Sequence, residues 1–181
     1  MNRLTYILII IIIFGCQSES ENNDHWGGLS PDLISAVDIS DYPKILSYSP
    51  TFYDENNNEI NFINALIQNG VNTIRLRLWV NPADESSSLE EVKEFSNELR
   101  SLGFKIWITP HFSDTWAHPG QQQIPSNWES LNFEELKNQL YAHTNQIMSE
   151  INPDYIQIGN EINTGILLSL IHISEPTRRT D

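Results

Sequence analysis

Hydrophobic positions along the chain change repeatedly from a two-residue period to a helical period. Alternating apolar and polar residues predict half-buried strands, and apolar residues recurring every three to four positions predict amphipathic helices. Strand followed by helix, several times over, is typical of a parallel α/β sheet, either a barrel or a doubly wound sheet. No glycine-rich phosphate loop follows the first strand, which disfavours a nucleotide-binding fold. The predicted strands are 33–39, 71–80, 104–111 and 155–163, and the predicted helices are 60–68, 86–102 and 133–151.

The strand at 155–163 ends by presenting an amide and a carboxylate side by side, Asn160 and Glu161. Alternation predicts Ile156 and Ile158 on the face toward the helices and Glu161 on the inward face. In a β/α barrel, active sites lie at the carboxyl ends of the strands, so an inward acid there indicates chemistry. The alternative is a helix that begins here, with Asn160 as its N-cap and Glu161 in its first turn.

The strand at 71–80 places two arginines, Arg75 and Arg77, on the same face as Trp79. On an edge strand these cations would simply be solvated. A helical pattern follows the strand, however, which predicts an inner strand of a β/α series with both arginines toward the barrel interior. An interior cation requires a carboxylate partner.

The loop at 112–128 is rich in aromatic and amide side chains, among them Trp116 and Trp128. Aromatic rings that face pyranose rings, with amides and acids for the hydroxyls, are what a sugar cleft requires. The alternative is a surface loop whose tryptophans pack on the core. The loop and the strand before it also contain His111, Asp114 and His118, but their spacing fits no zinc motif, and we expect no metal site there.

The composition narrows the partners of the protein. With 24 acidic and 10 basic residues, the formal net charge is -14, which disfavours binding to nucleic acid and to anionic membranes. The chain has a single cysteine, Cys16, so it has no intrachain disulfide and no cysteine-based zinc site.

The N-terminus predicts export. A charged start and a short apolar run ending at Cys16 resemble a bacterial lipoprotein signal, with a signal peptide at 1–15 and lipidation of Cys16. The alternative is an uncleaved anchor helix. Residues 16–28 are polar and acidic and predict a flexible tether. We therefore expect an exported protein, lipid-anchored to the bacterial outer membrane, and the acids after Cys16 resemble the export signal of surface-exposed lipoproteins.

Three motifs, at 75–79, 111–121 and 157–163, together resemble glycoside hydrolase family 53, the endo-β-1,4-galactanases. The resemblance extends over about residues 33–167, and its middle motif is the most specific. It implies an α/β fold that is the N-terminal half of a (β/α)8 TIM barrel, strands 1 to 4. It also implies retaining hydrolysis of β-1,4-galactan or arabinogalactan, no cofactor, and a monomer at full length, and it leaves a calcium site in the missing half open.

The resemblance also assigns roles to residues. Glu161 corresponds to the general acid/base and Asn160 to the residue that binds the sugar 2-hydroxyl, while Arg77 corresponds to the arginine beneath the nucleophile. The family has an aspartate where this chain has His118, which leaves the role of His118 open. The remaining residues expected to bind substrate are His111, Asp114, Trp116, Trp79 and Trp128.

The C-terminal residues 168–181 resemble a translated sequencing adapter, and the alternative is a genuine strand and turn. We therefore expect a partial barrel at 29–167 and a non-native tail at 168–181. The nucleophile of the family would then be absent from this chain, and the fragment would be inactive. Two other functions stay open: another retaining β-glycanase of the same clan, acting on xylan, mannan or β-glucan, or a non-catalytic, glycan-binding surface lipoprotein.

Overall fold

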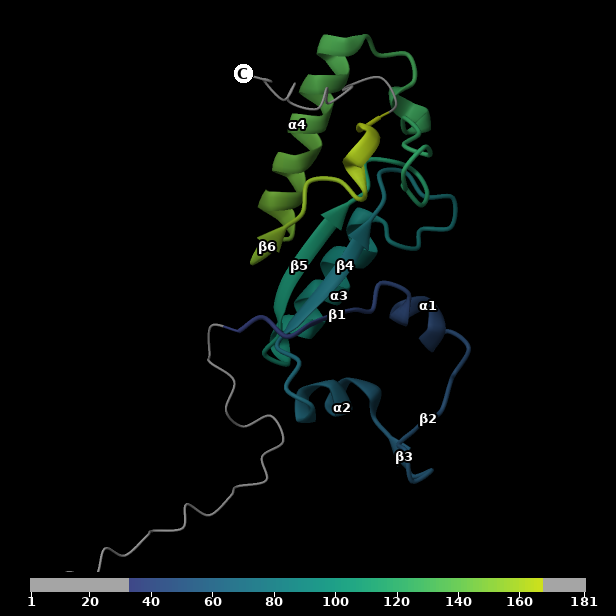
Figure 1. Ribbon diagram of the computed structural model, residues 1–181, viewed down its shortest axis with the longest axis vertical. Helices are drawn as coiled ribbons and strands as arrows, with labels where there is room; N and C mark the ends of the chain where they lie inside the picture. The colour runs from purple at the N-terminus through teal and green to yellow at the C-terminus, as the bar shows by residue number, and fades with distance from the viewer. Residues whose placement is uncertain (1–32, 168–181) are drawn as a thin grey trace, which may run out of the picture.

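The computed structural model describes residues 33–167. The predicted signal peptide, Cys16, the predicted tether and the tail at 168–181 lie outside the described residues. The described part is an α/β unit built on a parallel sheet (Figure 1). None of its helices combines the length and the apolar character that a membrane crossing needs.

The main sheet has four parallel strands in the order β1-β4-β5-β6. Its central pair, β4 and β5, runs in register from Thr73 opposite Lys105 to Leu78 opposite Pro110. Successive strands of the sheet are neighbours, and helices connect them, which confirms the predicted first four strands of a (β/α)8 barrel. The strands are β1 (Ala36–Asp38), β4 (Thr73–Leu78), β5 (Lys105–Pro110) and β6 (Tyr155–Ile156).

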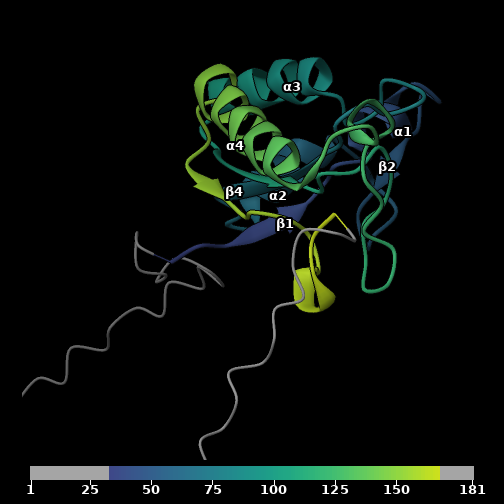
Figure 2. The ribbon, with the colours of Figure 1, turned by 90° about the horizontal axis from the view of Figure 1, so that it is seen from above.

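Two helices, α3 (Leu89–Ser101) and α4 (Phe133–Glu150), lie side by side over one face of this sheet (Figure 2). The strand residues that face them are apolar and buried, as the alternation predicted. Burying one such side chain contributes about 1.5–3 kcal/mol, so this layer is the main source of stability. Its buried residues include Ile74, Leu76, Leu78, Ile106 and Ile108 from the strands and Val92, Phe95, Leu99 and Ile147 from the helices.

The helices begin at polar caps. The hydroxyl of Ser88 accepts a hydrogen bond from the backbone N–H of Glu91 at the start of α3. At the start of α4, Asn132 forms a capping box with Glu135. Such caps contribute about 0.5–2 kcal/mol each and fix where a helix starts. The first predicted helix is present as α2 (Phe62–Gln68), so all three predicted helices are confirmed.

The segment between β1 and α2 contains elements that the sequence pattern did not predict. They are a short helix, α1 (Tyr42–Leu46), and a hairpin of β2 (Phe52–Tyr53) and β3 (Glu59–Ile60). In the hairpin loop, the carboxylate of Asp54 accepts hydrogen bonds from two backbone N–H groups. Elements of two to five residues are too short to show a period, so none of these three was predicted.

The last predicted strand, 155–163, is much shorter than expected. After β6 the backbone N–H of Gln157 donates one further hydrogen bond to the carbonyl of Ile108, at 2.9 Å. The chain then bends away and continues as a short 3-10 helix, η2 (Ile162–Thr164). Because the strand ends early, Ile158 is exposed and does not pack under the helices, so that part of the prediction is wrong.

Candidate active site

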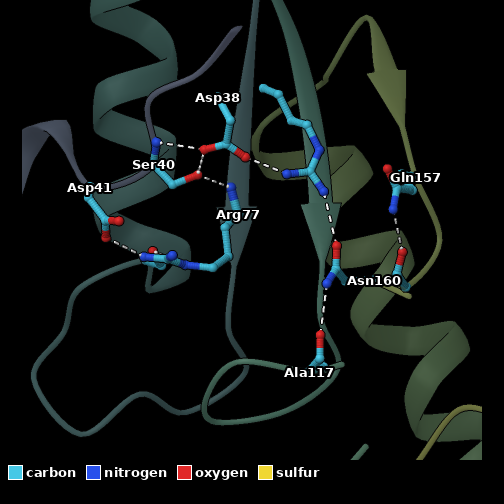
Figure 3. Close-up of polar contacts among 10 residues, drawn as sticks. Asp38, Ser40, Asp41, Arg77, Ala117, Gln157 and Asn160 are labelled. Carbon is cyan, nitrogen blue, oxygen red and sulfur yellow. Dashed lines mark hydrogen bonds and ion pairs between the residues drawn. The ribbon is translucent and has the colours of Figure 1, made fainter. Parts of the chain in front are cut away.

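The carboxyl ends of the strands bring charged side chains to one edge of the sheet. Arg75 and Arg77 alternate with the core residues of β4, so they lie on the face opposite α3 and α4, as predicted. Arg75 forms an ion pair with Asp38, the last residue of β1. Arg77 forms one with Asp41, at 2.7 Å (Figure 3). The predicted carboxylate partners of the two arginines therefore come from β1 and the turn after it.

The guanidinium of Arg77 lies against two indole rings, and the residue as a whole is 5% exposed. Its Cζ atom lies 4.3 Å from the ring centroid of Trp79 and 5.3 Å from that of Trp116. Its Nε donates to the hydroxyl of Ser87 at 3.1 Å, and a terminal nitrogen donates to Asp41. A desolvated cation–π contact is worth about 2 kcal/mol, so Arg77 stabilises both indoles at this edge. Three residues expected to bind substrate are thus in contact with one another.

His111 is buried at the end of β5, with 1% of its surface exposed. Its Nδ1 accepts a hydrogen bond from the backbone N–H of Ala117 at 3.1 Å, and its ring meets that of Trp116 edge to face. Burial, followed by the charges of Arg77 and Arg75, lowers the pKa of His111 to about 4. A neutral ring whose Nδ1 accepts must carry its proton on Nε2, and that N–H has no partner among the described residues. His111 therefore offers a buried N–H donor.

The side-chain amide of Asn160 is held at both ends, and the residue as a whole is 6% exposed. Its Oδ1 accepts from Arg75 at 3.1 Å, and its Nδ2 donates to the carbonyl of Ala117 at 2.7 Å (Figure 3). A short helix does begin after Glu161, but no side chain caps it. The alternative in which Asn160 serves as a helix N-cap is therefore wrong.

Glu161 is exposed and its backbone is left-handed, with φ at +49°. The segment that it opens lies on the sheet face opposite α3 and α4 (Figure 2). The buried side chain of Gln122 donates to the carbonyl of Asn160 at 2.8 Å and lies 3.4 Å from that of Glu161. Gly159 has a φ of +83°, and a Cβ there would lie 2.5 Å from the Cγ2 of Ile162. A glycine and a loop amide thus set the backbone that carries Glu161.

Asp114 and His118 take part in the internal structure of the loop. One carboxylate oxygen of Asp114 accepts from the backbone N–H of Ser126 at 2.8 Å and from its hydroxyl at 2.7 Å. The other oxygen is buried and has no partner among residues 33–167. His118 bonds to the side chain of Gln121 and pairs with it as an isolated bridge. Asp114 therefore both closes the loop and keeps one oxygen free.

Trp128 lies away from the edge. It belongs to η1 (Ser126–Trp128), is 2% exposed, and packs in a second core cluster with Phe112 and Leu136. This position corrects the prediction of a substrate-facing indole, and for Trp128 the alternative of a tryptophan packed on the core is right. The physical reason is that α4 begins directly behind the loop and its apolar face needs a cover.

No group of three or more His, Cys, Asp or Glu side chains in the described part of the chain is arranged to hold a metal ion. His111 and His118 have separate protein partners, and Asp114 bonds to the loop. The geometry thus offers hydrogen-bond donors, arginine charges and a carboxyl group for chemistry.

Several residues at this edge were not singled out from the sequence as functional. They share the role of holding a candidate residue in place. A usable signal existed for the aspartates: Asp38 lies near the carboxyl end of the first predicted strand and Asp41 just after it, so both reach the same edge as the arginines. The pattern did not distinguish Gln122 from the other glutamines at 121–123, or Ser87 from the other serines at 86–88. These residues are Asp38, Ser40, Asp41, Ser87 and Gln122.

Comparison with known proteins identifies the family. The family model described as glycosyl hydrolase family 53 matches residues 34–176. Arabinogalactan endo-β-1,4-galactanase A of Emericella nidulans is 38% identical over 107 residues, which are 56% of this chain and 31% of that protein. Endo-β-1,4-galactanase of Bacillus subtilis is 29% identical over 151 residues, 76% of this chain and 35% of that protein.

A solved structure supports the same family. The Ignisphaera aggregans GH53 catalytic domain superposes with a TM-score of 0.70 at 39% identity, covering 77% of this chain and 42% of that chain. This chain therefore spans about a third of the length of the curated relatives that it matches, and less than half of the solved domain. The family model nevertheless covers most of the chain, and the motifs at the sheet edge lie within it. The chain belongs to glycosyl hydrolase family 53.

Proposed function

We propose that the protein cleaves β-1,4-galactan or arabinogalactan internally, with retention of anomeric configuration. The observation that carries this proposal is a pair in the segment after β6: a buried amide, Asn160, bound by Arg75, directly before the exposed Glu161. The names of two relatives, both endo-β-1,4-galactanases, support galactan as the substrate.

In this proposal Glu161 is the general acid/base. Its protonated form assists departure of the leaving sugar, and its ionised form then activates water. Asn160 binds the 2-hydroxyl, and His111 and Asp114 are further substrate-binding residues, whose Nε2 and Oδ1 atoms, unpartnered in the described part of the chain, are buried. Trp116 is 47% exposed and offers an aromatic face to a pyranose ring.

Retention requires a second carboxylate about 5–5.5 Å from the first, and it must be ionised and free to attack. Asp38 and Asp41 lie at the same edge, but each is bound to an arginine. We therefore propose that the nucleophile comes from outside residues 33–167. Arg75 and Arg77, on the inner face, would keep such a carboxylate ionised.

A hybrid barrel tests this function. It joins residues 33–167 of this chain to the remainder of the Ignisphaera aggregans GH53 catalytic domain, in place of the part that the superposition covers. We expect the hybrid barrel to shorten β-1,4-galactan, with the β-anomer of the new reducing end appearing first in proton NMR. We expect the 181-residue chain alone to show no turnover.

The same measurement distinguishes the proposed function from its alternatives. Cleavage of xylan, mannan or β-glucan in preference to galactan would replace the substrate with that of another β-glycanase. Retention of galactan on an affinity gel without any cleavage would indicate a glycan-binding protein. Initial release of the α-anomer would contradict the retaining mechanism.

We also propose that the protein is exported and anchored to the bacterial outer membrane through a lipid on Cys16, with its galactan-binding part held by a tether at the cell surface. The run from Tyr6 to Phe14 before this cysteine supports the proposal. Growth of an expressing Gram-negative cell with an alkyne fatty acid should label the wild-type chain, and Cys16→Ser should abolish the label. Equal labelling of the two would contradict lipidation at Cys16.

A further inference from the structure

We propose that Asp38 is a positioning residue that fixes the side-chain amide of Asn160 by way of Arg75. One oxygen of Asp38 accepts from the first terminal nitrogen of Arg75, and the second terminal nitrogen donates to Oδ1 of Asn160 at 3.1 Å (Figure 3). These contacts join β1, β4 and the segment that follows β6. The claim that this amide binds substrate rests on the proposed function. The contacts themselves are observed in the structure and do not depend on it.

The carboxylate of Asp38 is itself held in one orientation. Its Oδ1 accepts from the backbone N–H of Ser40 at 3.0 Å and from the hydroxyl of the same residue at 2.6 Å, which leaves Oδ2 for Arg75. Burial raises the pKa of Asp38, but the hydrogen bonds from Ser40 and Arg75 outweigh it, so the pKa is lowered overall. Asp38 is therefore ionised at neutral pH and presents one oxygen to the guanidinium.

No other carboxylate within residues 33–167 is bound to Arg75. The other arginine of this strand, Arg77, lies two positions along on the same face and is bound to Asp41. Two arginines on one face repel each other, and each needs its own counter-charge to stay partly buried. Removing Asp38 would therefore free the guanidinium of Arg75 to turn toward solvent or toward Asp41.

The amide of Asn160 matches its two neighbours in one orientation only. A guanidinium can only donate and a backbone carbonyl can only accept. Oδ1 must therefore face Arg75, and Nδ2 must face the carbonyl of Ala117, 2.7 Å away. With Arg75 displaced, one of the two restraints is lost, and the amide can rotate.

The test is substrate-free NMR of the complete 181-residue chain labelled with 15N. The measured quantities are the two Nδ2 proton shifts of Asn160 and their exchange rates with water. We expect Asp38→Ala to raise those rates at least tenfold and to reduce the separation of the two shifts. Asp38→Asn keeps the shape and an accepting oxygen but removes the charge, so its effect should be intermediate.

Two controls distinguish positioning from general loosening. Asp84→Asn removes an exposed carboxylate that pairs with Lys44, and it should leave the Asn160 signals unchanged. The side-chain amide of Asn132, which caps α4, should not move in any variant. Wild-type shifts and exchange rates for Asn160 in Asp38→Ala would overturn the proposal. If that variant does not fold, the isosteric Asp38→Asn decides by the same criterion.

The outcome is independent of hydrolysis, because no substrate is present. An inactive hybrid barrel would leave the positioning role of Asp38 standing. Unchanged Asn160 signals would remove that role and leave the galactanase proposal intact.

Discussion

Replacing Glu161 with glutamine in the hybrid barrel is expected to lower kcat on β-1,4-galactan by about 10²–10⁴-fold, the range that general acid–base catalysis contributes. Glutamine has nearly the same shape but cannot give a proton to the leaving oxygen or take one from water. The backbone at this position is set by Gly159 and by the hydrogen bonds from Gln122, neither of which involves the carboxyl group of Glu161. The substitution should therefore remove the chemistry and leave the local structure.

Initial rates and substrate dependence on soluble galactan give kcat and KM separately. KM should stay within a few-fold of the wild-type value, because the carboxyl group acts mainly in the transition state. Glu55→Gln, at an exposed glutamate of the hairpin loop, is the matched control and should change neither constant. A Glu161→Gln hybrid that keeps wild-type kcat would exclude Glu161 as the acid/base.

The parts of the fold that were predicted correctly are those in which several residues repeat one pattern. Along β4, apolar residues alternate with Arg75 and Arg77, and only one arrangement puts the apolar set under the helices. The arginines then had to face the other side, and their need for carboxylates followed from electrostatics. Period and charge together therefore predicted both the layer order and the existence of the ion pairs.

The parts that were missed depend on contacts between segments that no local pattern encodes. The strand before Glu161 was expected to continue to residue 163, but β6 bonds to its neighbour for only two residues and then bends. Trp116 and Trp128 belong to the same aromatic-rich loop, and the sequence does not distinguish them. Only the position of α4 decides that Trp128 is buried and Trp116 is exposed. The choice of Asp38 and Asp41 as arginine partners likewise depends on the register of β1 against β4.

Burial and the same arginines together keep His111 neutral. A histidine that is already buried would have to gain a proton next to two guanidinium groups, which adds repulsion to the cost of desolvation. The neutral ring in turn can accept from the N–H of Ala117, whose carbonyl binds Asn160. Charge at the sheet edge and the orientation of the amide are thus linked through one residue of the loop.

The free energy of unfolding of this chain is expected to be about 2 kcal/mol lower at pH 5 than at pH 7 because of His111 alone. The pKa of His111 is lowered to about 4 in the folded chain, from an ordinary value of 6.5. Between these values the unfolded chain binds the proton and the folded chain does not, so falling pH favours unfolding. His143 is also buried, which lowers its pKa and adds a contribution of the same sign.

Urea unfolding at pH 7 and pH 5, followed by tryptophan fluorescence, measures this difference. The lowered pKa of Asp38 acts below its ordinary value of 3.8, outside this window, so the histidines are observed separately from it. His111→Gln cannot gain a proton, and it should remove most of the pH dependence, leaving the share of His143. An equal loss of stability between pH 7 and pH 5 in wild type and His111→Gln would show that His111 is not held neutral. The argument that burial and the two arginines keep this ring uncharged would then be wrong.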